Sequence, residues 1–416
     1  MTTRRHILAG LGGAALLTAC REPVARLTAD RAAVPDLVLA DTTSGLVTLL
    51  GERMDRHGLA IAAPDGSRVY TATPLDGNAT TLSTVESSTG REMERARLAG
   101  RWMPRVVSPS GRLVVLTPAG AGSSGVASAG AAGQPVARTR SRIMIAGSGG
   151  AVHDVHLTGN FEPDAVTYDE TGVFVLEWLP ATAPDHYRVR LMEFGTGTPQ
   201  PLLTRNKVAV PAGAEEEMRG EGRQAVLHPT GHILYTLYTH QPDHRHTRNI
   251  LAGRRSDVHA FVHVLHLAER WAYCLDLPAP FGQGPAAGHA LALSPDGSRL
   301  MVVDATAGRL ALADAAALTI SRVVALPPVG GTASVAAGAG SCFVAAGEWI
   351  HVVDSAAGAV AGTWRAGGAV HGLGVSRDGA RLYVGRPDGI AWLDSRAGAQ
   401  LGSVPVAGIL SLRCAR

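Results

Sequence analysis

The stretch that decides the fold is Ala290-Leu-Ala-Leu-Ser-Pro-Asp-Gly-Ser-Arg-Leu-Met-Val-Val303. Two short apolar runs flank a Ser-Pro-Asp-Gly turn, and runs of this length and composition are typical of β-strands. Gly297 can adopt a positive φ, and the side chain of Asp296 can bond the neighbouring backbone, so the pair favours a tight hairpin turn. The stretch therefore predicts two antiparallel strands joined by a tight turn.

The same turn recurs along the chain, each time between two apolar runs. Its glycines are Gly66, Gly111, Gly172, Gly231, Gly297, Gly340 and Gly379. The shortest steps between them, 43 and 39 residues, match the period of a four-stranded propeller blade. The longer steps require insertions. No convincing amphipathic helix is found after the N-terminal segment, so the pattern predicts an all-β chain.

The repeat resembles a known family. Ser294-Pro-Asp-Gly-x-x-Leu-x-Val, together with Val352-Val-Asp-Ser-Ala-Ala-Gly358, is similar to the YVTN-type, surface-layer-like β-propeller repeat. The resemblance is clearest after residue 288 and implies one β-propeller domain of four-stranded antiparallel blades over residues 36–416. It implies an architecture and not a chemistry, because such repeats occur in binding modules, lactonases and quinoprotein dehydrogenases.

Strands left over at both ends predict how the ring closes. Leu37–Asp41 and Leu46–Leu50 at the front, and Ile409–Arg413 at the back, belong to no complete unit. Pairing them in one sheet removes two open sheet edges. The closing sheet is either a split eighth blade or a set of extra strands on a seventh. We favour seven blades, the more common number, with eight as the alternative.

The N-terminus carries an export pattern. Arg4 and Arg5 precede an apolar segment, Ile7–Leu17, that is too short for a permanent membrane span, and Leu17-Thr-Ala-Cys20 follows. This order resembles a bacterial lipoprotein signal peptide of twin-arginine type. The resemblance implies a signal peptide over residues 1–19, a lipid on Cys20 and a tether to residue 35. The protein is then expected at the outer face of the cell membrane. An ordinary cleavable signal, the general secretory route and a cytoplasmic start are the alternatives.

Composition excludes some functions. The 416-residue chain has a net charge of +3, and its densest basic cluster is short and lacks aromatic residues, so we expect no nucleic-acid partner. We also expect a monomer. Cys274, Cys342 and Cys414 form no Cys-x-x-Cys pair. We interpret them as small buried hydrophobic residues; a disulfide between two of them is the alternative.

Long connections between strands indicate where a ligand binds. Residues 118–139, 179–186 and 240–259 each join the second and third strands of a blade, and residues 205–224 join two blades. In a propeller, both kinds of connection emerge on the same face of the disc. Function often lies on loops above a rigid scaffold, so this face is the predicted binding surface.

Two of these loops carry polar clusters. One contains His240, Asp243, His244 and His246, and the other contains the run Glu215-Glu216-Glu217. Imidazoles beside a carboxylate suit a transition metal, with His244 and His246 as the candidate ligands, although the spacing matches no recognised motif. The acidic run could attract a cation or a basic peptide. We favour the simpler interpretation, that both loops are solvated, and expect no cofactor.

Enzyme signatures are missing from the sequence: there is no Gly-x-Ser-x-Gly elbow, Walker loop, His-Glu-x-x-His helix or haem-attachment motif. We therefore assign no catalytic residue. The favoured hypothesis is a membrane-tethered scaffold that binds a protein or small ligand through its loop-bearing face. The alternative is a propeller enzyme of lactonase or quinoprotein dehydrogenase-like type that uses a metal.

Overall fold

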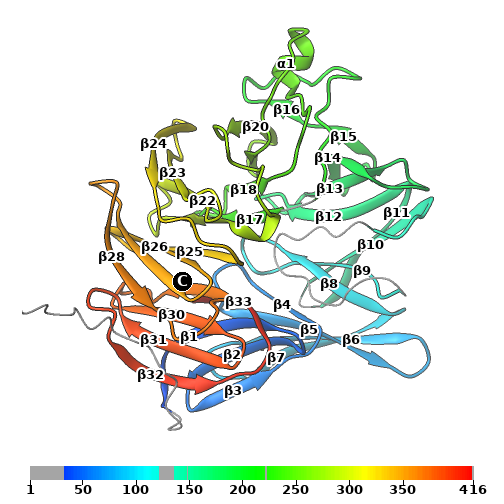
Figure 1. The fold of residues 1–416 in the computed structure, drawn as a ribbon. Coiled ribbons are helices and arrows are strands. Elements are labelled where there is room, and N and C mark those ends of the chain that lie inside the picture. Colours follow the sequence, from blue (N-terminus) through cyan, green and yellow to red (C-terminus); the bar gives the residue numbers. More distant parts are fainter. Residues whose placement is uncertain (1–31, 121–134, 148, 221–222, 415–416) are drawn as a thin grey trace, which may run out of the picture.

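A computed structural model describes residues 32–120, 135–147, 149–220 and 223–414. The predicted signal peptide with Arg4 and Arg5, and the predicted lipidation site Cys20, lie outside the described residues. The described chain forms eight mainly antiparallel sheets arranged as the blades of a ring (Figure 1). At six of the eight junctions the inner strands of neighbouring blades contact each other closely. The all-β propeller expected from the repeat is confirmed.

Seven blades are continuous in sequence, and each runs from an inner strand to an outer one. Blades 1 and 2 contain β4 (Ala60–Ala62), β5 (Arg68–Leu75), β6 (Ala79–Glu86), β7 (Glu92–Ala99), β8 (Trp102–Val107), β9 (Val114–Pro118), β10 (Arg140–Gly147) and β11 (Gly150–Thr158). Blades 3 and 4 contain β12 (Asn160–Val166), β13 (Gly172–Leu179), β14 (His186–Glu193), β15 (Pro199–Pro201), β17 (Gln224–Leu227), β18 (Ile233–Tyr238), β19 (Phe261–His266) and β20 (Trp271–Asp276). Blades 5 to 7 contain β21 (His289–Leu293), β22 (Arg299–Asp304), β23 (Arg309–Asp314), β24 (Thr319–Ala325), β25 (Ala333–Ala337), β26 (Ser341–Ala346), β27 (Trp349–Asp354), β28 (Ala359–Arg365), β29 (Gly372–Val375), β30 (Arg381–Arg386), β31 (Gly389–Asp394) and β32 (Gln400–Pro405).

The eighth blade closes the ring with strands from both ends of the chain. Its order is β33 (Ile409–Cys414), β1 (Val34–Thr42), β2 (Gly45–Gly51) and β3 (Arg53–Arg56), with β33 innermost. Closure by the two termini is confirmed, but the preference for seven blades is wrong. The three N-terminal strands and the C-terminal strand together make a complete four-stranded blade, so the leftover strands are not additions to another sheet.

The recurrent turn behaves as its residues predict. Gly297 has a φ of +77°, and Asp296 Oδ1 accepts a hydrogen bond from the Ser298 backbone N–H at 3.1 Å. Asp378 makes the same bond to the Ala380 N–H at 3.0 Å. These acids are thereby occupied in stabilising turns, which agrees with their spacing along the repeat.

A separate hydrophobic cluster fills each junction between neighbouring blades. The cluster between blades 8 and 1 has four fully buried members: Leu39, Leu46, Ala62 and Val69. The cluster between blades 7 and 8 has twelve, including Ile409 and Leu412 of β33. The closing blade is therefore held mainly against blade 7.

Blade 4 has a fifth strand that the sequence does not predict. The two-residue β16 (Leu203–Thr204) pairs in parallel with β20 at the outer edge of this blade. From there the chain crosses blade 4 to its innermost strand, β17. The connection after β18 contains the five-residue helix α1 (Thr247–Leu251), which stands at the top of Figure 1, and a 3-10 turn, Ala286–Gly288, precedes β21. Among the described residues, no helix is long and apolar enough to cross a membrane.

Candidate functional site

The described parts of the long connections of blades 2, 3 and 4 lie together, as predicted, and they contact one another. The Arg138 N–H donates to the Ala181 carbonyl at 3.1 Å, which joins the first connection to the second. His186 Nε2 lies 3.5 Å from Glu217 Oε2, which joins the second to the crossing segment. Residues 121–134 of the first connection lie outside the described part of the chain.

Backbone contacts fix the crossing segment on both sides. On one side, Met218 and Tyr187 exchange two backbone hydrogen bonds of 2.7 and 2.9 Å. On the other, the buried amide of Gln241 accepts from the Arg219 N–H at 2.9 Å and donates to the Arg219 carbonyl at 2.8 Å. The residues just before Met218, which are the three glutamates, are thus held between blades 3 and 4.

The acidic run divides into three different environments. Glu215 is 8% exposed and accepts bonds of 2.7 and 2.9 Å from Arg190 and one of 3.1 Å from Arg188. Glu217 is half exposed and lies beside His186. Glu216, with 16% of its side chain exposed, points toward the histidine loop. The interpretation of the run as a solvated loop is therefore wrong for Glu215 and Glu216.

Glu216 meets His244 and His246 in a triangle of electron-pair donors. Its Oε2 atom lies 3.7 Å from His244 Nε2 and 3.4 Å from His246 Nδ1, and the two nitrogens are 3.1 Å apart. The side chains of His244 and His246 are 1% and 0% exposed. These two histidines are buried, which corrects the expectation that they are solvated.

Neighbouring groups determine which nitrogen of each imidazole faces the triangle. His244 Nδ1 lies 3.2 Å from the Glu217 carbonyl oxygen, which can only accept, so the ring proton belongs on Nδ1. His246 Nε2 lies 2.5 Å from Asp276 Oδ1, which favours a proton on Nε2. Both inward nitrogens then present lone pairs to each other and to a carboxylate. Such an arrangement needs a proton or a metal ion between the donors.

Blade 4 supplies the floor of this site. Phe261 pairs with Asp276 across β19 and β20, and His263 pairs with Cys274, so the four side chains share one face of the sheet. His244 stacks on the Phe261 ring at 4.4 Å between centroids. The Cys274 thiol donates to Glu216 Oε2 at 2.9 Å.

Charges and burial shift the pKa values here in a consistent direction. Burial alone would raise the pKa of Glu216, but the interactions with His244 and His246 hold it well below its usual value. Burial would lower the pKa of His246, yet Asp276 and Glu216 raise it overall. Burial, reinforced by Glu216, raises the pKa of the Cys274 thiol well above its usual value. Without a metal, both shifts favour a protonated His246 beside an ionised Glu216.

The triangle has the dimensions of a metal site. Ligand atoms about 2.0–2.1 Å from a tetrahedral zinc ion are about 3.4 Å from one another. The three measured separations, 3.1, 3.4 and 3.7 Å, bracket that value, and these three residues form a group whose ligand atoms lie within 4.8 Å. The Glu217 carbonyl and Asp276 supply the outer contacts that usually orient metal-bound imidazoles.

The other predicted binding residues lie outside the triangle. His240 bonds Thr239 at 2.8 Å and lies near His289, and Asp243 is exposed. The sequence analysis did not identify Asp276, which lies against His246 Nε2, or Arg188, which binds the Glu215 carboxylate. The sequence shows only where these two residues lie: Asp276 ends β20, and Arg188 lies on β14 next to the segment that carries Glu215. The three described cysteines are free, and Cys274 and Cys342 are buried, which agrees with the favoured interpretation.

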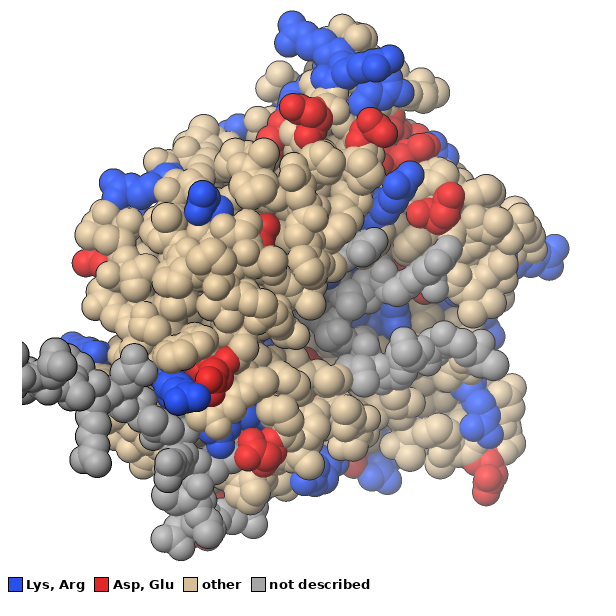
Figure 2. Space-filling model, viewed as in Figure 1, with Lys and Arg blue, Asp and Glu red and all other residues tan. Residues whose placement is uncertain are grey.

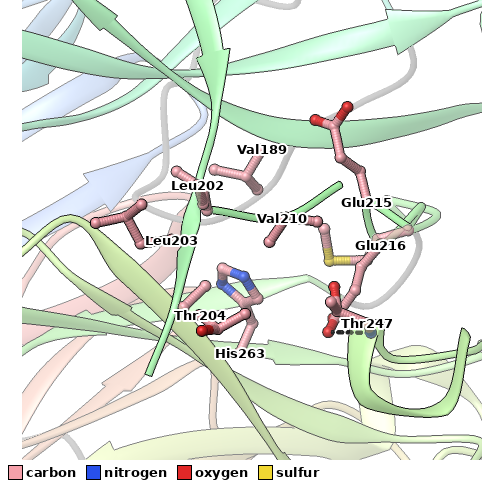
Figure 3. Close-up of a pocket in the computed structure, with 11 residues that line it drawn as sticks. Val189, Leu202, Leu203, Thr204, Val210, Glu215, Glu216, Thr247 and His263 are labelled. Atoms are coloured by element: carbon pink, nitrogen blue, oxygen red, sulfur yellow. Dashed lines mark hydrogen bonds between the residues drawn. The ribbon is translucent and has the colours of Figure 1, made fainter. Parts of the chain in front are cut away.

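Two hollows adjoin the triangle. Glu216 lines a small cavity of about 50 Å³ whose walls are mostly apolar, with the His263 ring facing into it and the Glu215 carboxylate pointing away (Figure 3). His244 borders an open groove of about 420 Å³ whose other lining residues include His186, Glu217, Arg219 and Asp243. Figure 2 shows side chains of both charges gathered around α1 at this end of the molecule. Of the three triangle residues, His244 is the one that borders this groove.

No protein-family model matches the chain, and no curated protein sequence matches it. Solved structures do match. The dihydro-heme d1 dehydrogenase NirN in complex with DHE has 11% identity and a TM-score of 0.53, over 94% of this chain and 78% of its own. Apo AztD from Citrobacter koseri has 10% identity and a TM-score of 0.54, over 92% of this chain and 98% of its own. Identities this low show a shared propeller fold and nothing about ligand or reaction.

Proposed function

We propose that this protein is a metal-binding β-propeller, which takes up one divalent transition-metal ion of the zinc class on the face that carries the long loops. The observation that carries the proposal is the convergence of Glu216, His244 and His246 on one point. Imidazole and carboxylate donors suit zinc and its neighbours in the first transition row. A rigid sheet beneath and fixed loops above keep the donors in place before the ion arrives.

The burial of these donors suits the binding of an ion better than exposure of their charges to water. The side chains of His244 and His246 are at most 1% exposed, and without a metal their burial is compensated only by the neighbouring polar groups and by a proton shared within the site. Metal uptake replaces the proton on His246 with a cation that all three donors can share. Affinity is then coupled to proton release.

We also propose that the propeller works outside the cytoplasm, anchored to the membrane by lipid on Cys20. The support is the order of features in residues 3–20: paired arginines, a short apolar segment and a lipobox-like Leu-Thr-Ala-Cys. In this proposal the ring is held at the outer face of the membrane while its loop-bearing face binds the ion.

Equilibrium zinc binding to protein first stripped with a chelator tests the metal proposal. We expect one ion per chain, with affinity reduced at least about 100-fold in His244→Gln and in His246→Gln. His240→Gln is the matched control, because His240 lies in the same loop outside the triangle, and it should bind like the wild type. Absence of zinc binding by the wild type, or equal binding by all variants, contradicts the proposal.

A metal-dependent propeller enzyme of the lactonase or quinoprotein dehydrogenase-like type is the second candidate. The cavity beside Glu216 is the observation that favours it, because His263 faces that cavity and, within the described residues, makes no hydrogen bond. An enzyme would need a coordination position open to substrate. The identity of the fourth ligand therefore separates the two candidates.

A further inference from the structure

We propose that Cys274 is the fourth metal ligand, so that Glu216, His244, His246 and the Cys274 thiolate enclose the ion with protein donors alone. This inference rests on the metal-binding function proposed above and specifies it further. It assigns the site to ions that accept sulfur, nitrogen and oxygen together, as zinc does, and it makes the site a closed one.

The first argument is contact. Cys274 Sγ lies 2.9 Å from Glu216 Oε2, the same oxygen that forms one corner of the triangle. Cys274 is 1% exposed and projects from the middle of β20, so its backbone is fixed by the sheet. Cys274 Sγ does not belong to the group of ligand atoms that all lie within 4.8 Å of one another, so the proposal requires its side chain to turn toward the ion when the ion binds.

The second argument is charge. A divalent ion held by Glu216 and two neutral imidazoles would leave one net positive charge in a buried site. The thiolate of Cys274 cancels it, and the nearby Asp276 carboxylate is already paired with Arg248 at 2.6 Å. A buried site of zero net charge costs less desolvation free energy than a charged one. A thiolate this close to a carboxylate is also tolerable only with a cation between them.

The third argument is the choice among the remaining donors. His263 lies directly across the ladder from Cys274, but no hydrogen bond in the described structure links it to the triangle. Asp276 is already beside His246 Nε2, on the side of the ring away from the triangle. Cys274 is thus the additional donor that already contacts a triangle atom.

On binding, the S–H bond of Cys274 breaks, a metal–sulfur bond forms, and the proton passes to solvent; no oxidant or reductant takes part.

Cobalt substitution tests the assignment on the whole protein. We expect wild type loaded with one equivalent of Co²⁺ to show an intense thiolate-to-cobalt charge-transfer band in the near ultraviolet. Cys274→Ser should lose this band and bind zinc more than about 100-fold more weakly, beyond the roughly 10–100-fold effect of losing an outer contact. Cys342→Ser is the matched control, because Cys342 is a fully buried cysteine in another blade junction, and it should keep the band.

The outcomes separate the two levels of the proposal. Wild type that binds Co²⁺ without the band overturns the role of Cys274 and leaves the metal-binding function standing. A band that persists in Cys274→Ser also overturns it. Wild type that binds no metal overturns the function itself. If Cys274→Ser does not fold, the wild-type spectrum still decides the question. Zinc titrations in buffers of different ionisation enthalpy add a second readout, because the wild type should release one more proton per ion than Cys274→Ser, and equal release would contradict a thiolate ligand.

Discussion

Removing the C-terminal strand should destabilise the whole ring, although it shortens the chain by only eight residues. A chain that ends before Ile409 lacks β33, which is the innermost strand of the closing blade and pairs only with β1. The deletion exposes the edge of β1 and removes Ile409 and Leu412 from the cluster between blades 7 and 8.

The magnitude follows from what β33 buries. Ile409 and Leu412 are 1% and 7% exposed, and burial of the apolar surface of each side chain adds about 2 kcal/mol to the free energy of unfolding. The ladder adds about 1 kcal/mol for each backbone hydrogen bond lost. Ser411 also donates to Asp41 at 2.6 Å. The total loss is at least about 6 kcal/mol. Since the entropy of unfolding for a domain of this length is about 0.8 kcal/mol/K, Tm should fall by about 8 °C.

Differential scanning calorimetry, at matched protein concentration and with chelator present, measures this shift. A chain that ends at Cys414 is the control, because it keeps every described residue of β33 and should melt like the full protein. Ile409→Ala should lower the stability by about 2–5 kcal/mol without exposing a sheet edge. A deletion variant that melts within about 1 °C of the full chain would refute the closure argument.

Three further predictions concern protons and location. Burial lowers the pKa of His263 to about 4, so between about pH 4 and pH 6.5 the unfolded chain binds a proton at this residue and the folded chain does not. The metal-free wild type should therefore lose about 3 kcal/mol of stability as the pH falls through this window. The His263→Gln variant should lose much less. Because the pKa of His246 is raised, protons compete with the metal there, and zinc affinity should fall about tenfold per pH unit for each proton displaced once the pH is below that pKa, a dependence that isothermal titrations at several pH values measure. Cys20→Ala should move the protein from the membrane fraction to the soluble fraction or leave it unprocessed, and equal release of variant and wild type by mild salt would contradict the lipid anchor.

The propeller is predictable from sequence because its signals are local. The turn residues Asp296 and Gly297 are enough by themselves to predict a hairpin. The leftover strands at both ends of the chain already indicate ring closure. The number of blades is harder to predict from the sequence, because insertions change the number of residues between one turn and the next.

The candidate site was only partly predictable, because its burial comes from contacts far apart in sequence. His244 and His246 lie on a loop that reads as solvated, and nothing nearby in the sequence shows that Gln241 will hold it to Arg219, 22 residues away. Cys274 and Asp276 face the site because of the register between β19 and β20, which the sequence of either strand alone does not specify.

Anomalous diffraction from crystals grown with zinc tests the central claim most directly. Difference maps from data collected on both sides of the zinc absorption edge should contain one strong peak per chain. The account predicts that peak about 2.0–2.2 Å from Glu216 Oε2, His244 Nε2 and His246 Nδ1. A peak at another place on the molecule, or none at a zinc concentration that saturates binding in solution, would contradict it.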